Sequence, residues 1–122
     1  MRRILLVQGQ RFRIYALVLA NGDCPVENFI AHMPDASRKS MLNVLQRHAE
    51  AGQILNEQKA RLLGDGIFEF KSRQGDRLLW FYPPGRSGQT IITQSFHKGA
   101  PLRSEIQRAK QLRDQYHEEV GQ

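Results

Sequence analysis

The sequence is short of cysteine, of long hydrophobic runs and of acidic residues, and the first two shortages exclude whole classes of protein. Its one cysteine, Cys24, cannot form a disulfide within the chain or build a zinc or iron–sulfur site that needs several cysteines. The apolar run at residues 4–7 is shorter than the roughly 7 to 15 residues of a signal peptide or the about 20 of a membrane span. We therefore expect a cytoplasmic protein without membrane contact.

Motifs for nucleotide or metal chemistry are also missing from the sequence. It contains no glycine-rich phosphate loop, no HExxH and no CxxC. Its carboxylates do not cluster in the way that a two-metal nuclease requires. We expect a function that uses neither a metal nor any other cofactor.

Positive charge is what the sequence has in excess. The chain has 18 Lys and Arg against 12 Asp and Glu, which gives a formal net charge of +6 and a pI near 10.0. Between residues 71 and 113 the only acids are Asp76 and Glu105, and the bases are Lys71, Arg73, Arg77, Arg86, Lys98, Arg103, Arg108, Lys110 and Arg113. Because apolar and aromatic residues separate these bases, we expect folded structure to display them to an anionic partner.

The first half of the chain predicts a strand followed by a helical hairpin. Residues 11–19 change from alternating to continuous apolar character, as a strand that enters a core does. Pro25 suits the first position of a short helix that Pro34 ends. Asp35 can cap a longer amphipathic helix, and Gly52 suits its left-handed end.

The second half predicts three strands and a last helix. Residues 53–65 favour neither helix nor strand, but a period of two begins at Ile67 and places Phe68 and Phe70 opposite their charged neighbours. The remaining predicted elements are strands at residues 77–82 and 89–96 and a helix that opens at Pro101. The short connections between the three strands predict an antiparallel meander.

These elements predict an α+β fold in the order β-α-α-β-β-β-α. An N-terminal helical hairpin should cover one face of a small antiparallel or mixed sheet of about four strands, with a further helix at the C-terminus. The length of 122 residues, without repeats or a linker, predicts one domain over residues 1–122.

The candidate site is a group of cations at one end of the predicted sheet. Lys71 and Arg73 share a strand face, Arg77 opens the return strand, and His97 and Lys98 follow the last strand. Cleavage of RNA needs cations for the charge that builds on the phosphate, and proton donors and acceptors for the 2′-hydroxyl and 5′-oxygen. We predict Arg73, Arg77, His97 and Lys98 as catalytic residues, a hypothesis that requires cations from separate strands to meet over one cleft.

Further side chains are candidates for contact with the nucleic acid. Cations pair with phosphates and an aromatic ring can stack on a base, so the predicted RNA-binding residues are Lys71, Arg86, Arg103 and Tyr82. The alternative for Tyr82 is that its ring packs in the core instead of stacking on a base. Glu69 is expected to pair with Lys71 or Arg77 rather than to act in catalysis, and His48 is expected to be a packed helix residue.

The order of these motifs resembles the RelE/ParE toxin superfamily, and most of all its phage-derived HigB-like branch. The resemblance covers roughly residues 11–117. It rests on four stretches in this order: GDGIFEFK at residues 64–71, RLLWFY at residues 77–82, SFHK at residues 95–98, and the helix after Pro101 with Glu105, Ile106 and Ala109.

The resemblance implies a toxin of a type II toxin–antitoxin system. Such a toxin is an endoribonuclease that cleaves mRNA on the ribosome without a metal, by attack of the 2′-hydroxyl on the adjacent phosphate. It also implies a cognate helix-turn-helix antitoxin as a partner.

The resemblance carries to particular residues by position. Lys71 and Arg73 match its basic strand residues, Arg77 matches the arginine that opens the next strand, and Lys98 matches the first lysine of a Phe-x-Lys-Lys stretch, with His97 at the variable position before it. We expect Arg73 and Arg77 to stabilise the phosphate, and His97 or Lys98 to transfer protons. Residues 98–101, KGAP, depart from the family pattern because they lack its second lysine, a helix-capping threonine and several loop residues.

Two other functions fit the same sequence. ParE-type members of the superfamily poison DNA gyrase without cleaving RNA. A shared fold therefore does not fix a shared activity. The chain can also be a noncatalytic nucleic-acid-binding phage protein.

Overall fold

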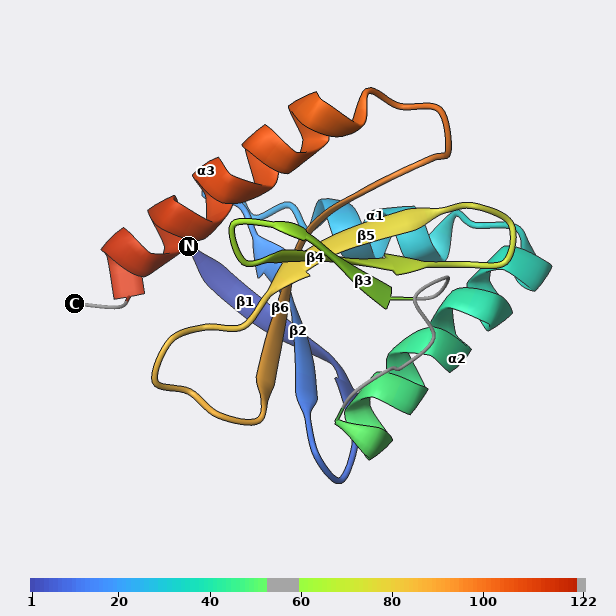
Figure 1. The fold of residues 1–122 in the computed structure, drawn as a ribbon, viewed down its shortest axis with the longest axis horizontal. Helices are drawn as coiled ribbons and strands as arrows, with labels where there is room; N and C mark the ends of the chain where they lie inside the picture. The colour runs from blue at the N-terminus through green and yellow to red at the C-terminus, as the bar shows by residue number, and fades with distance from the viewer. Residues whose placement is uncertain (53–59, 121–122) are drawn as a thin grey trace.

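The described part of the chain forms a six-stranded mixed sheet with helices on both faces (Figure 1). The computed structural model describes residues 1–52 and 60–120. The strands are β1 (Arg2–Gln8), β2 (Arg13–Val18), β3 (Ala60–Gly64), β4 (Ile67–Lys71), β5 (Arg77–Phe81) and β6 (Gln89–Phe96). The helices of these residues are α1 (Pro25–Ala31), α2 (Asp35–Ala51) and α3 (Leu102–Val120).

The strands lie in the order β1-β2-β6-β5-β4-β3. β4, β5 and β6 pair in antiparallel fashion, which confirms the predicted meander. β2 pairs with β6 in parallel, so the sheet is mixed. The α+β class and the helical hairpin of α1 and α2 are confirmed as well.

The sheet has more strands than the four or so that we expected. β1 and β3 are the added strands, and both lie at the edges of the sheet. Residues 53–59, the first part of the segment without a clear period, lie outside the described residues. An edge strand pairs on one side only and packs incompletely, which leaves Leu5 47% and Leu62 60% exposed, so its sequence pattern is weak.

The ends of the helices follow local chemistry. Pro25 is the first residue of α1, as predicted. α2 begins at Asp35 itself, with Pro34 at the N-cap and no side-chain capping hydrogen bond, so the expected cap by Asp35 is wrong. At the other end Gly52 has a φ of 78° and its N–H donates to the carbonyl of His48, which confirms the left-handed stop.

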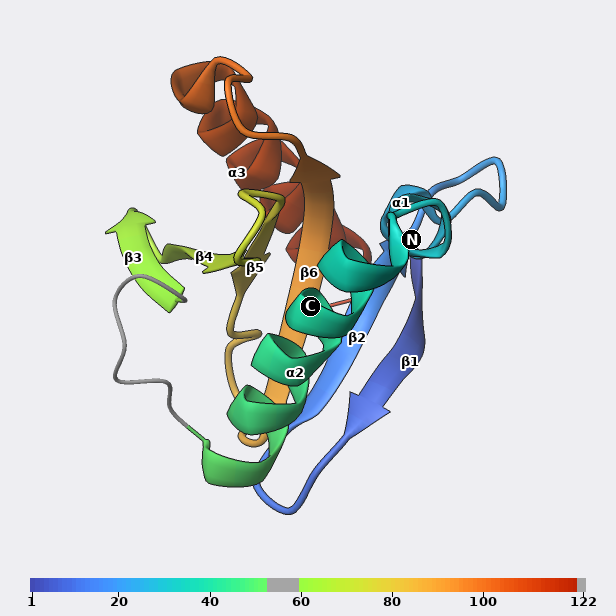
Figure 2. The ribbon, with the colours of Figure 1, turned by 90° about the vertical axis from the view of Figure 1, so that its right-hand side faces the viewer.

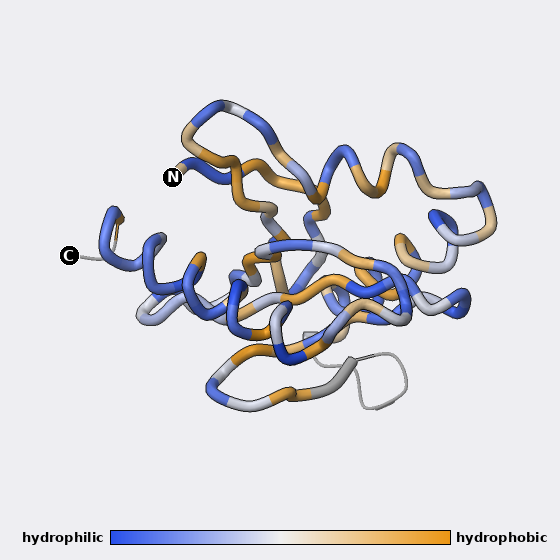
Figure 3. The backbone as a smooth tube through the Cα atoms, turned by 90° about the horizontal axis from the view of Figure 1, so that it is seen from above, coloured by the Kyte–Doolittle hydropathy of each residue, from blue (hydrophilic) through white to orange (hydrophobic). Residues whose placement is uncertain are grey.

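Two apolar cores lie on the two faces of the sheet, between the sheet and the helices that Figure 2 shows on either side of it. The core under α1 and α2 contains Phe70 and Trp80, and the core under α3 contains Phe81 and Tyr116. Figure 3 shows hydrophobic residues along the central strands and hydrophilic ones along much of the helices. Because side chains alternate along a strand, neighbouring residues of β5 contribute to different cores.

No helix within residues 1–52 and 60–120 combines the length and the apolar character that crossing a membrane requires.

Candidate nucleic-acid site

Most of the predicted catalytic and RNA-binding residues lie at one end of the sheet. Lys71 is the cross-strand partner of Arg77, which in turn is the partner of Phe96. His97 and Lys98 directly follow Phe96, so they lie beside the turn that joins β4 to β5. The sheet register therefore brings together positions that are far apart in the sequence.

Lys98 lies directly over that turn. A Cβ atom built on Gly75 would be 3.1 Å from Cβ and 3.2 Å from Cδ of Lys98. Gly75 has a φ of 96°, a left-handed conformation that glycine adopts without strain. Lys98 is exposed, as is Arg103 in the first turn of α3, so both are accessible cations at this end of the sheet.

Arg77 is held by a buried carboxylate. Its Nη1 donates to both oxygens of Glu69, at 3.1 and 3.0 Å, and this confirms the expected ion pair. The two side chains are 16% and 2% exposed. Nε of Arg77 is buried and has no hydrogen-bond partner among the described residues. The nearby negative charge therefore offsets much of the positive charge of Arg77.

The strand face that carries Glu69 differs from our expectation. The alternation of β4 predicts a charged outer face, but α3 packs over this side of the sheet and leaves Glu69 only 1% exposed. Arg73 is not on that face, because β4 ends at Lys71 and Arg73 belongs to the following turn. Its backbone N–H donates to Oγ of Ser40 on α2 at 2.8 Å, and its side chain is exposed.

His97 is paired with a carboxylate that the sequence analysis did not select. Nδ1 of His97 lies 2.7 Å from Oδ1 of Asp76. The His97 side chain is 73% exposed, whereas that of Asp76 is 9% exposed. The imidazole also packs against the ring of Phe29 on α1, with 4.7 Å between the ring centroids.

The predicted catalytic residues are divided between the two faces of the sheet. Arg77 lies on the same face as Leu79 and Phe81, which pack under α3, whereas His97 contacts α1 on the opposite side. Asp76, in the turn directly before β5, pairs with His97 on the α1 side, whereas Arg77 in β5 pairs with Glu69 on the α3 side. The cations therefore lie around one end of the sheet on both of its faces, whereas the sequence hypothesis required them to meet over one cleft.

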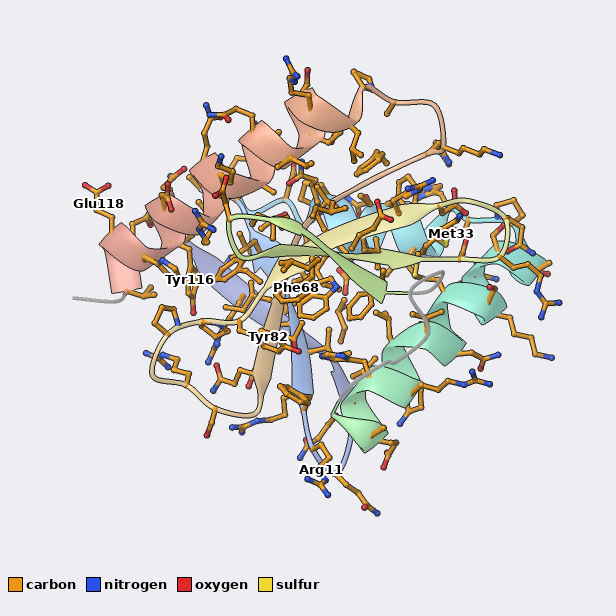
Figure 4. All side chains as sticks on the ribbon, in the orientation of Figure 1. Arg11, Met33, Phe68, Tyr82, Tyr116 and Glu118 are labelled. Atoms are coloured by element: carbon orange, nitrogen blue, oxygen red, sulfur yellow. The ribbon has the colours of Figure 1, made fainter. Side chains whose placement is uncertain are left out.

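Tyr82 and Arg86 do not join this group. They follow the other end of β5, in the connection to β6, away from the turn that carries Asp76. Tyr82 is 41% exposed, and its ring packs against Phe68 and Trp80 at centroid distances of 5.3 and 4.9 Å. Figure 4 shows Tyr82 close to Phe68. Burial of the remaining part raises the pKa of the Tyr82 hydroxyl.

Two cations of α3 fix the turn between β3 and β4. Nζ of Lys110 lies 2.8 Å from Oδ2 of Asp65, and Arg113 donates to the Asp65 carbonyl. The Lys110 ammonium lowers the pKa of Asp65. Lys110 and Arg113 thus stabilise the fold, whereas Arg103 and Arg108 are exposed cations of α3.

His48 is a core residue, as expected. It is 1% exposed, and its Nε2 lies 2.9 Å from Oγ1 of Thr90. Burial lowers the pKa of His48 to about 4, so the imidazole stays neutral in the folded protein at neutral pH. Across residues 1–52 and 60–120, His, Cys, Asp and Glu form no group of three or more that could hold a metal ion.

The fold, with cations at one end of its sheet, is consistent with a small α+β toxin. A family model described as phage-derived protein Gp49-like (DUF891) matches residues 28–114, and the chain belongs to this family. Gp49-like proteins are related to RelE-type toxins. The matched segment includes every predicted site residue, from Lys71 to Arg103. Among curated proteins, no sequence matches the chain.

Proposed function

We propose that this Gp49-like protein is a toxin of the HigB-like branch that cleaves mRNA on the ribosome and is neutralised by a helix-turn-helix antitoxin. One observation carries the proposal. An exposed imidazole, that of His97, is held by a carboxylate next to the exposed Lys98, at a sheet end that also carries Lys71 and Arg73. Family membership supports a toxin, and the net charge of +6 supports a nucleic-acid substrate.

The proposed reaction needs two proton transfers and stabilisation of one anion. The 2′-oxygen attacks the adjacent phosphorus, and its proton goes to Nε2 of His97. The bond from phosphorus to the 5′-oxygen breaks, and Lys98 donates a proton to that oxygen. The products are a 2′,3′-cyclic phosphate and a 5′-hydroxyl. Arg73 offsets the charge that builds on the phosphoryl oxygens.

Arg77 has a smaller electrostatic part in this proposal than in the sequence analysis. Its Nη1 donates to both oxygens of Glu69, and only 16% of its side chain is exposed. We assign Arg77 to holding the end of the sheet together, and Arg73 and Lys98 to contact with the phosphate.

A purified translation system tests the proposal. The unaltered chain should cut mRNA only in the presence of ribosomes, with cut sites mapped by primer extension. His97→Gln should reduce the cleavage rate about 100-fold or more, the usual contribution of a positioned general base. Lys98→Ala should also slow cleavage strongly, because it removes the proposed acid and a cation.

Arg47→Ala is the matched control for Lys98→Ala. Arg47 is an exposed cation on α2, so its loss changes the net charge equally without touching the proposed site. If both variants slow cleavage to the same degree, net charge rather than the site is responsible. In cells that express the chain, growth arrest with intact transcripts and broken DNA would instead indicate the gyrase-poisoning function.

The noncatalytic alternative has one observation in its favour, the neutralisation of Arg77 by Glu69. A protein of this kind should bind RNA with an affinity that falls steeply with salt concentration, because binding releases counterions. It should leave every phosphodiester bond intact on and off the ribosome.

A further inference from the structure

We infer that Asp76 is a positioning residue for His97, because its carboxylate fixes the imidazole with the proton on Nδ1 and leaves the Nε2 lone pair open to the substrate. The inference rests on the proposed function, in which Nε2 of His97 accepts the 2′-hydroxyl proton. It adds a residue that the sequence analysis assigned to no role.

The turn between β4 and β5 holds Asp76 rigidly. The N–H of Ser72 donates to the Asp76 carbonyl at 2.9 Å, and the N–H of Asp76 donates to Oγ of Ser72 at 3.0 Å. The N–H of Gly75 closes the turn on the Ser72 carbonyl at 3.0 Å. Because the Asp76 side chain is 9% exposed, few rotamers are open to it, and its carboxylate is a fixed acceptor.

The contact determines which nitrogen of His97 carries the proton. An ionised carboxylate can only accept hydrogen bonds, so Nδ1 of His97, 2.7 Å from Oδ1 of Asp76, must be the donor. In the neutral imidazole the other nitrogen then has a free lone pair. Nε2 makes no hydrogen bond to the described residues, and the side chain is 73% exposed.

A second contact limits rotation of the ring. Phe29 on α1 packs against the imidazole with 4.7 Å between centroids and 41° between planes. The carboxylate holds one edge of the ring and the phenyl group supports its face. His97 is therefore oriented although most of its side chain is in solvent.

The pair matches the chemistry of the proposed reaction. When Nε2 takes the 2′-hydroxyl proton, the imidazole becomes a cation, and the adjacent Asp76 carboxylate stabilises it while the Nδ1 proton stays in place. A carboxylate has this role beside the histidine of a Ser-His-Asp triad, where it sets the tautomer without itself taking the proton.

Nitrogen NMR of the imidazoles in the full chain tests the orientation without reference to activity. At about pH 8, where histidines are neutral, the unaltered protein should show His97 protonated on Nδ1. Asp76→Ala should give a mixture in which Nε2 carries much of the proton. His32 is the internal control, because its Nδ1 contacts the Asn28 carbonyl at 2.7 Å and should stay protonated in both proteins.

Cleavage kinetics test the consequence. Asp76→Asn, which preserves the shape of the side chain, should lower kcat roughly 100-fold and leave KM nearly unchanged, because the carboxylate acts on the reacting imidazole and not on substrate binding. The melting temperature of each variant shows whether the turn is intact. The single variant His97→Gln should cleave as slowly as the double variant that combines His97→Gln with Asp76→Asn, since a positioning residue acts only through its partner.

The outcomes separate this inference from the proposed function. If the unaltered chain cleaves RNA and the Asp76 variants keep the same tautomer and kcat, the positioning role is wrong and the ribonuclease stands. If the unaltered chain cleaves nothing on ribosomes, the proposed function and the catalytic part of the inference fail together. The NMR result then still decides whether Asp76 orients His97.

Discussion

Acidification from pH 7 to pH 4 should destabilise this protein strongly, and His48 should be a principal cause. The imidazole lies between α2 and the sheet, with Nε2 2.9 Å from Oγ1 of Thr90. The rings of Phe12, Phe70 and Trp80 surround it at centroid distances of 4.8 to 5.1 Å. A cation in this apolar site would lose its hydration without gaining an acidic partner among residues 1–52 and 60–120.

The sign and the size of the effect follow from linkage. Burial lowers the pKa of His48 from 6.5 to about 4. The unfolded chain therefore takes up a proton at this residue below pH 6.5, whereas the folded protein does so only near pH 4. The stabilisation is fully present above pH 6.5 and is lost as the pH falls towards 4. This difference in pKa corresponds to about 3 kcal/mol in the free energy of unfolding.

Urea denaturation of the unaltered protein and of His48→Gln, at pH 7 and pH 4, measures the contribution. Glutamine can still donate to Thr90 but does not titrate, so the variant should lose about 3 kcal/mol less between the two pH values. Asp65, His117 and Glu119 also have lowered pKa values, but they titrate in both proteins and cancel in the difference. Equal pH dependence of the two proteins would refute the reasoning, as would an NMR titration of His48 with a midpoint near 6.5.

Two further predictions concern the fold. Glu69→Gln should lower the free energy of unfolding by about 3 kcal/mol in urea denaturation, because it leaves Arg77 partly buried without its carboxylate; a change below 1 kcal/mol would mean that solvent already screens the pair. Gly9→Ala should destabilise by at least about 2 kcal/mol, because its Cβ would lie 2.4 Å from the carbonyl carbon and oxygen of Ala49. Gly85→Ala is its control, with open space around the new Cβ and only the strain of a φ of 70°; similar melting temperatures for the two variants would contradict the packing argument.

The elements that the sequence predicted best have strong periods and marked ends. β6 has the expected bounds, residues 89–96, because its alternation is regular and a loop with two prolines precedes it. α3 follows the apolar period after Pro101, and Gly52 ends α2. β1 and β3 were missed because an edge strand needs only one neighbour, so local pattern constrains its residues weakly.

The candidate site was less predictable than the fold because periodicity does not show what covers a face. The alternation of β4 correctly separated Glu69 from Phe68 and Phe70, but only the position of α3 shows that the charged face is buried. Asp76 carried no signal at all, since its contact with His97 joins two turns 21 positions apart in the sequence. The register of β5 against β6 is what brings them together.

Glu69 in β4 and Asp76 in the turn before β5 have different roles because their side chains lie on different faces of the sheet. Glu69 is buried and Arg77 partly buried on the face towards α3, so their ion pair belongs to the stability of the sheet. Asp76 is also buried, but His97 reaches into solvent, so that pair can meet a substrate. Loss of the Glu69 carboxylate should therefore reduce stability first, whereas loss of the Asp76 carboxylate should change the imidazole tautomer first. If Glu69→Gln shifted the His97 tautomer as much as Asp76→Asn does, the two faces would form one coupled site, and this division would be wrong.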